Sequence, residues 1–360
     1  MLYSLLYNLH EWFSPMNVFR YITFRTSLAI LTAMVFSLIF GPCIIRRLKR
    51  LSMTQQIRDD GPKTHMNKAG TPTMGGILII VCILVSVFLW GDLKNIYIWV
   101  MIVSLAGFGF IGFLDDYLKV KRKNHYGLSA LYKFGNQIAL ALLIGVFLYM
   151  NPKDPYADVL SVPFFKKWFF DLGWFYIPFS IIVIIGSSNA VNLTDGIDGL
   201  AIGLVAVAAL ATGALVYISG HKGLAQYLQV LYLPLTGELT VFCGAMFGAS
   251  LGFLWYNSYP ADVFMGDVGS LGLGGSLGTI AVITKHEIVL AVVGGIFVIE
   301  TISVILQVFS FKLTGKRIFK MAPIHHHFEL KGWPEPKVIV RFWIIGIMLA
   351  LLSLATLKVR

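Results

Sequence analysis

Long apolar segments separated by short polar ones make up most of this chain. A helix of about 20 apolar residues crosses a hydrocarbon core of roughly 30 Å, and segments of that length recur from one end of the sequence to the other. We expect ten spans, at about 22–45, 73–90, 96–114, 131–149, 174–190, 200–219, 238–256, 268–284, 288–311 and 342–357. The pattern leaves no room for a separate soluble domain, so it predicts a single all-α polytopic membrane domain over 1–360.

Composition supports the same class of protein. Hydrophobic residues make up 57% of the 360 residues and charged residues 13%, with a mean hydropathy of +0.76, whereas a soluble domain carries roughly 25% charged residues. The first 13 residues lack a basic region and a cleavage site, so we expect a short interfacial helix rather than a removable signal peptide. Cys43, Cys82 and Cys243 lie in apolar segments, which favours buried thiols over a disulfide or a zinc site.

The basic residues predict the orientation of the spans. About two thirds of the 29 lysines and arginines lie in 46–72, 115–133 and 312–341, on one side of a ten-span topology, and that side is expected to be cytoplasmic. Both termini are then periplasmic. Because the net charge of +11 is concentrated beside spans, anionic lipid and anionic substrates are favoured over nucleic acid. We expect cytoplasmic loops at about 46–72, 115–130, 191–199, 257–267 and 312–341.

Acidic residues gather on the same predicted side, although they were not used to define it. Asp115 and Asp116 follow an apolar run in "IGFLDDYLKVKRKN", and two adjacent carboxylates repel each other and are costly to desolvate. The other aspartates at cytoplasmic span ends are Asp195, Asp198, Asp262 and Asp267. Carboxylate clusters suit Mg²⁺, which takes few carboxylates and completes its shell with water and phosphate.

Two of these acidic motifs also have structural interpretations. In "NAVNLTDGIDGLA", Asp195 and Asp198 would be one turn apart in a helix, and Gly196 would let the backbone approach a ligand; a turn with helix caps fits the same residues. In "VFMGDVGSLGLGG", Asp267 could simply cap a helix. No strand precedes that motif, so its glycines favour close helix packing over a dinucleotide-binding loop.

A histidine segment and a group of lysines complete the candidate chemistry. Three adjacent histidines, from His325 to His327, stand in "MAPIHHHFELKGWPEP". Their side chains should diverge, so phosphate contact or acid–base work is favoured over a shared metal, with a solvated loop as the alternative. Lys119, Lys121 and Lys123 could hold phosphate or could only reflect the cytoplasmic charge bias.

These groups together indicate phosphoryl transfer to or from a lipid, because positioning and charge neutralisation are the main requirements of that reaction. An ion-coupled secondary transporter is the alternative from another class, and it predicts ionisable groups near the bilayer midplane. Glu300 is the one acid clearly placed deep in a span, and we interpret it as part of the bundle structure.

Five motifs carry a resemblance to a known family. "TPTMGG", "GFLDDYLKV", "NAVNLTDGIDGLA", "VFMGDVGSLGLGG" and "APIHHHFELKGWPEPKVIVRFW" resemble the phospho-N-acetylmuramoyl-pentapeptide transferases, within the polyprenyl-phosphate N-acetylhexosamine 1-phosphate transferase superfamily. The resemblance covers essentially the whole chain, in the expected order. It implies ten helices in the bacterial inner membrane, periplasmic termini, a cytoplasmic-face site and a role in peptidoglycan synthesis, and hence in cell shape and division. The histidine segment distinguishes this family from the nearest alternative, the polyprenyl-phosphate GlcNAc-1-phosphate transferases.

The resemblance also implies a reaction. Phospho-MurNAc-pentapeptide passes from UDP-MurNAc-pentapeptide to undecaprenyl phosphate, giving lipid I and UMP, with Mg²⁺ required. Because one phosphoanhydride replaces another, the reaction should be nearly thermoneutral. Direct attack by the lipid phosphate and a covalent aspartyl intermediate both remain open. Members of the family often form homodimers.

The family's site residues match positions in this chain. Its adjacent aspartates correspond to Asp115 and Asp116, and its metal-bound aspartate to Asp267, so these three are the expected metal ligands. The expected catalytic residues are Asp115, Asp116, Asp267, Lys119, His325 and His326. The expected substrate-binding residues are Lys68, Lys123, Lys133, Asn192, Asp195, Asp198, Asn257, Phe264 and His327, with the Phe264 ring suited to stacking on uracil.

Overall fold

The computed structural model describes residues 2–51, 53, 70–122, 127–153, 155–162 and 168–359. Almost all of the regular structure is helical. The helices are α1 (Leu2–Asn8), α2 (Ile22–Arg50), α3 (Gly76–Trp90), α4 (Ile96–Arg122), α5 (Ala130–Met150), α6 (Tyr176–Thr194), α7 (Leu200–Gly220), α8 (Lys222–Leu228), α9 (Leu239–Asn257), α10 (Gly266–Thr284), α11 (Glu287–Val293), α12 (Gly295–Thr314), α13 (Ile324–Glu329) and α14 (Glu335–Val359). Strands β1 (Val159–Ser161) and β2 (Phe169–Asp171) form one antiparallel pair.

Nine helices of the described residues are long and apolar enough to cross a membrane. They correspond to nine of the ten expected spans, and this confirms the all-α polytopic class. The remaining expected span, 73–90, is occupied by α3, an apolar helix of 15 residues. Before α3, the backbone of Pro72 and Gly75 pairs with Phe264, in the loop that precedes α10.

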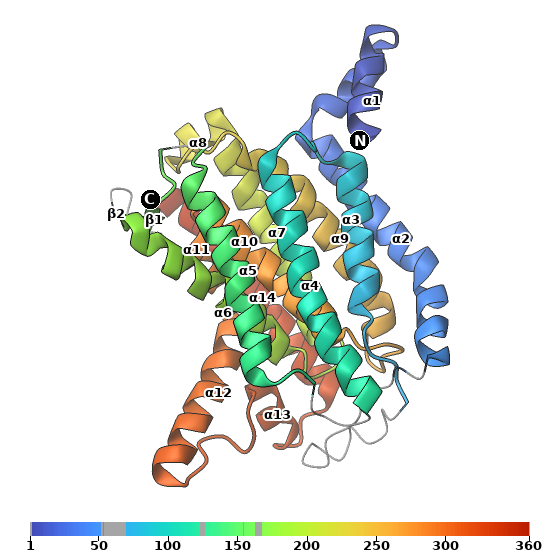
Figure 1. The fold of residues 1–360 in the computed structure, drawn as a ribbon, viewed down its shortest axis with the longest axis vertical. Helices are drawn as coiled ribbons and strands as arrows, with labels where there is room; N and C mark the ends of the chain where they lie inside the picture. Colours follow the sequence, from blue (N-terminus) through green and yellow to red (C-terminus); the bar gives the residue numbers. More distant parts are fainter. Residues whose placement is uncertain are drawn as a thin grey trace.

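Helix α10 is the centre of the bundle (Figure 1). Every residue from Val268 to Thr284 is buried, and the helix packs against α3, α4, α6 and α7. A Cβ atom added at Gly269 would lie 2.9 Å from the Cα atom of Gly76, and one at Gly274 would lie 2.8 Å from the Cα atom of Ser188. The glycines of this motif therefore permit close helix packing, as predicted, because small residues let backbones approach.

The ninth expected span, 288–311, is not one continuous helix. It divides into α11 and α12 at Gly294, whose backbone leaves the helical region with φ −90° and ψ 23°. Two adjacent glycines, Gly294 and Gly295, stand at this break, and glycine pairs are a common cause of sharp kinks. Figure 1 shows α12 leaving the bundle, with α13 beside its path. The ninth expected span is therefore confirmed by α12, with the short helix α11 before the break.

The two ends of the bundle differ in chemistry. In Figure 1 both termini and the β1–β2 pair lie in the upper part of the view, and α13 lies at the lower end. Just before β1, the Ala157 carbonyl accepts a hydrogen bond from Lys285 Nζ, which lies 3.9 Å from the centre of the Tyr176 ring, and the Tyr176 hydroxyl donates to the Glu287 carboxylate. The membrane side of each end stays a prediction.

Candidate active site

Three aspartates lie close together at one end of the bundle, and they come from two helices that are far apart in the sequence. Asp115 and Asp116 lie near the end of α4, and Asp267 lies in the first turn of α10. One carboxylate oxygen from each lies within 4.8 Å of the other two. The approach depends on Gly112, because a Cβ atom there would lie 2.1 Å from the Asp267 carbonyl oxygen.

Two lysines lie among these carboxylates. The Lys119 ammonium lies 2.7 Å from Asp115 Oδ2 and donates to Asp267 Oδ2 at 2.8 Å. The Lys133 ammonium, at the start of α5, donates to the same Asp267 oxygen at 2.6 Å and to Asp115 Oδ2 at 3.3 Å. Both cations therefore bridge α4 and α10, and they offset part of the repulsion among the acids.

Neutral donors fix the remaining carboxylate oxygens. The Leu128 backbone N–H donates to Asp115 Oδ1 at 2.7 Å, and the Val268 backbone N–H donates to Asp116 Oδ2 at 3.3 Å. Asn192 Nδ2, near the end of α6, donates to Asp267 Oδ1 at 2.7 Å and to Ser270 Oγ at 2.8 Å. The acidic centre thus receives groups from α4, α5, α6 and α10.

The second acidic motif is a turn between α6 and α7 rather than a continuous helix. It passes through Gly199, whose φ of +75° suits a residue without a side chain. Burial, together with the nearby charges of Asp267 and Asp198, raises the pKa of Asp195 to about 8. Asp195 therefore holds its proton at neutral pH, while Asp267 is surrounded by lysine and amide donors.

Asp198 and Asn257 hold this turn against the loop before α10. Asp198 Oδ2 accepts a hydrogen bond from the Ala261 backbone at 3.0 Å. Asn257 Oδ1 accepts from the Gly199 backbone at 3.0 Å, and its Nδ2 donates to the Val263 carbonyl at 2.8 Å. Both side chains therefore shape the wall of the site through backbone contacts.

Phe264 joins the same wall to the residues before α3. Its backbone N–H donates to the Pro72 carbonyl at 2.8 Å, and its carbonyl accepts from the Gly75 N–H at 2.9 Å. The ring is partly exposed. Sequence reasoning did not assign a site role to Pro72, Gly75 or Ser270; the "TPTMGG" motif itself was the signal that could have found the first two.

The prediction that the three histidines diverge is only partly right: the ring centres of His325 and His326 lie 4.1 Å apart, whereas His327 contacts another segment. His325 is fully buried, and its Nδ1 lies 3.1 Å from Glu300 Oε1. His326 Nδ1 contacts Glu329 Oε2 at 2.7 Å. His327 is on the other side of α13, where its Nδ1 accepts from the Lys320 backbone at 3.0 Å. The burial of His325 excludes a fully solvated loop for this segment.

Two expected substrate-binding residues, Lys68 and Lys123, lie outside the described residues. Of the others, Asn192 and Lys133 contact the acidic centre directly, whereas the contacts of Asp198 and Asn257 described above are with backbone. Neither Asp195 nor any of the histidines is among the groups that bridge Asp115 and Asp267.

The donor set fits a hard divalent cation. Three carboxylates can each offer an oxygen from one small volume, and Mg²⁺ prefers such ligands together with water and phosphate. Two lysines face these three carboxylates. Asp115, Asp116 and Asp267 are the residues that would hold the ion.

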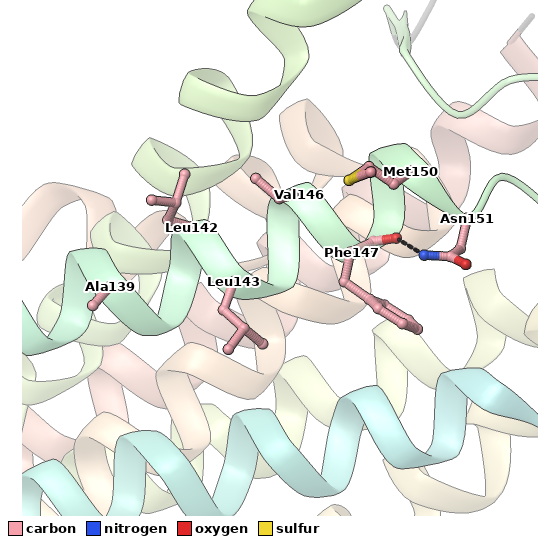
Figure 2. A pocket seen from close by; sticks show the side chains of 7 residues that line it. All are labelled: Ala139, Leu142, Leu143, Val146, Phe147, Met150 and Asn151. Carbon is pink, nitrogen blue, oxygen red and sulfur yellow. Dashed lines mark hydrogen bonds between the residues drawn. The ribbon is translucent and has the colours of Figure 1, made fainter.

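An apolar groove lies apart from this centre on the surface of α5 (Figure 2). It has a volume of about 600 Å³ and is lined by residues between Ala139 and Asn151. The groove begins six residues beyond Lys133, or about 9 Å along the helix axis. Figure 2 shows Leu142, Phe147 and Met150 along it, with Asn151 Nδ2 donating to the Phe147 carbonyl at 3.0 Å. Its lining suits contact with lipid rather than polar chemistry.

Comparisons with known proteins show which family this chain resembles. The model of glycosyl transferase family 4 matches residues 98–285, and signature 1 of the phospho-N-acetylmuramoyl-pentapeptide-transferases matches residues 68–80. Curated relatives named phospho-N-acetylmuramoyl-pentapeptide-transferase include proteins from Thermodesulfovibrio yellowstonii (69% identical over 361 residues) and Citrifermentans bemidjiense (57% over 360 residues), each covering 100% of both chains.

The helical bundle and these matches define a membrane-embedded transferase. Because relatives at 57% and 69% identity align over their whole length, the chain belongs to the phospho-N-acetylmuramoyl-pentapeptide-transferase family.

Proposed function

We propose that this protein transfers phospho-MurNAc-pentapeptide from UDP-MurNAc-pentapeptide to undecaprenyl phosphate, in the bacterial inner membrane and at its cytoplasmic face. Full-length similarity to curated members of the family supports the activity. The observation that carries the chemistry is the meeting of Asp115, Asp116 and Asp267 with two lysines at the end of a membrane bundle.

The bond changes are those of a phosphoanhydride exchange. An oxygen of undecaprenyl phosphate attacks the phosphorus that carries the sugar, a new P–O–P bond forms, and the bond to UMP breaks. UMP leaves with the electron pair, and the acceptor phosphate enters as an anion. Each side of the reaction contains one such anhydride, so the equilibrium should lie near unity.

Charge neutralisation is the main requirement of this step. Bound Mg²⁺ would supply positive charge at the pyrophosphate, with Asp115, Asp116 and Asp267 as its protein ligands. Lys119 and Lys133 already place ammonium groups beside two of these acids, where they can hold phosphate oxygens of either substrate. Asp115, whose Oδ2 faces both lysines, would accept a proton if the acceptor phosphate arrives protonated.

The nucleotide would lie against the wall made by the turn between α6 and α7 and the loop before α10. Phe264 offers its partly exposed ring to uracil, and the neutral form of Asp195 can donate to a nucleotide oxygen. Asp198 and Asn257 would hold the wall in shape. Lys68, Lys123 and the histidine segment, His325 to His327, are proposed to contact phosphate or sugar. A homodimer is a further prediction, to be tested by the mass of the protein in detergent.

The test is UMP release by purified protein in detergent. We expect release that requires UDP-MurNAc-pentapeptide, undecaprenyl phosphate and Mg²⁺ together, and that stops on chelation. Release with UDP-GlcNAc as the only donor would instead assign the protein to the GlcNAc-1-phosphate transferases. Absence of release with both donors, from folded protein, would contradict transferase activity and favour an ion-coupled transporter.

A further inference from the structure

Glu300 and His325 form a buried pair between two separate helices. Glu300 is the sixth residue of α12 and His325 is the second of α13. Both side chains are 0% exposed, and His325 Nδ1 lies 3.1 Å from Glu300 Oε1. Among the described residues, neither Glu300 oxygen and neither ring nitrogen of His325 makes a hydrogen bond of regular geometry, so the 3.1 Å contact is an ion-pair distance. The His325 ring lies beside this carboxylate as its ion-pair partner.

We expect this contact to fix the orientation of the His325 ring rather than to add much to the stability of the fold. A buried carboxylate is costly unless a partner offsets its desolvation, and the favourable arrangement presents the Nδ1–H of the ring to the carboxylate. A carboxylate beside one ring nitrogen fixes both the ring orientation and the tautomer, and leaves the other nitrogen for chemistry. Glu300 thus determines which nitrogen of His325 is directed away from α12.

The other nitrogen, Nε2, faces the turn between α6 and α7. A Cβ atom added at Gly196 would lie 2.2 Å from His325 Nε2 and 2.8 Å from its Cε1. Gly196 directly follows Asp195, whose pKa is raised in part by the charge of Asp267. Among the described residues, Nε2 has no hydrogen-bond partner. Because Gly196 has no side chain, the His325 ring can lie against the turn at the edge of the site.

We propose that Glu300 is a positioning residue, which holds His325 so that Nε2 is directed to the substrate side of the turn between α6 and α7. The proposal rests on the proposed function, and it gives Glu300 a role beyond the bundle packing expected from the sequence. The side chain of Glu300 does not itself contact the substrates. It acts through His325, whose Nε2 is buried beside Gly196 and would meet a phosphate or sugar oxygen once this turn moves aside.

The proposal is tested by kinetics of Glu300→Gln, Glu300→Asp, His325→Gln and the double variant. Glu300→Gln should lower kcat about 10- to 100-fold, as loss of a residue that orients a histidine commonly does. Glu300→Asp, which keeps the charge, should recover part of that loss. In the His325→Gln background, adding Glu300→Gln should lower kcat by less than a further twofold. An equal loss in both backgrounds would overturn the proposal, because Glu300 would then act independently of His325.

A second readout does not depend on turnover. In ¹⁵N-histidine-labelled protein, the resonances of His325 are those that His325→Gln removes. They should shift in Glu300→Gln and stay unchanged in Glu287→Gln, a matched buried acid near the opposite end of α10. Unchanged His325 resonances in Glu300→Gln would overturn the proposal. If the wild-type protein released no UMP, the proposed function would fail, and the resonances would still show whether the pair exists.

Discussion

Lys133 Nζ lies 2.6 Å from Asp267 Oδ2, although 134 positions separate the two residues in the sequence. The contact joins the start of α5 to the first turn of the buried central helix, and the same ammonium reaches Asp115. A lysine that the sequence places in a charge-biased cytoplasmic segment is therefore part of the acidic centre. Its removal should affect cation binding and turnover in opposite directions.

Lys133→Gln should increase the affinity of the centre for a divalent cation while it reduces turnover. Removing one positive charge strengthens the attraction between the three carboxylates and the ion, but the phosphates lose a neutralising group. Mn²⁺ binding followed by electron paramagnetic resonance, with UMP release on the same sample, checks both. Lys121→Gln is the control, because Lys121 on α4 is exposed. Weaker Mn²⁺ binding in Lys133→Gln would contradict this account.

Asp115→Asn should abolish turnover, by at least about 10²-fold, which is the scale of losing one electrostatic group at a reacting centre. The amide can still accept the Leu128 N–H at Oδ1, so the protein should stay folded and membrane-inserted. Activity and melting temperature are measured together. Asp262→Asn provides a control at an exposed aspartate of the same end. Near-normal turnover in Asp115→Asn would remove Asp115 from the mechanism.

Asp195 should make stability depend on pH. Its pKa is raised to about 8 in the folded protein, above the value of about 3.9 expected for an unfolded chain. Between these values the folded state binds more protons, so this contribution to stability is present at low pH and lost as pH rises through 8. Melting temperatures in chelator from pH 5 to 9 should fall more for wild type than for Asp195→Asn. Parallel curves would exclude a neutral Asp195.

Gly196→Ala should reduce turnover at least about tenfold without unfolding the protein. The new methyl group would lie 2.2 Å from His325 Nε2, and a buried ring held beside Glu300 cannot move away freely. The measurement is kcat alongside melting temperature. Gly186→Ala is the matched control, because nothing lies within 4 Å of the Cβ position at Gly186. Full activity in Gly196→Ala would show that the position of Nε2 does not matter.

Gly112→Ala should destabilise the bundle and separate the acids. The added Cβ atom would lie 2.1 Å from the Asp267 carbonyl oxygen, and overpacking of this kind costs about 1–3 kcal/mol. Both the melting temperature and Mn²⁺ binding should fall. Gly135→Ala, where no atom lies within 4 Å, should change neither. A variant with unaltered Mn²⁺ affinity would mean that the acids do not depend on this helix contact.

The sequence by itself determined the class of protein and most of its spans. Apolar length is a local property, and a segment of about 20 apolar residues has few alternatives to a membrane helix. The motifs also determined the family, because long patterns such as "NAVNLTDGIDGLA" are specific. The glycines of the α10 motif were interpreted correctly as packing residues, since no strand precedes them.

Only the tertiary structure decided which polar groups meet. It brings Asp115, Asp116 and Asp267 together while Asp198 binds backbone, it breaks the ninth span at Gly294, and it seats Glu300 against His325. These outcomes depend on contacts between residues far apart in the chain, and periodicity and charge counts contain no information on such distances. Close helix packing fixes the approach of the three aspartates, because Gly112 lets α4 come against the start of α10.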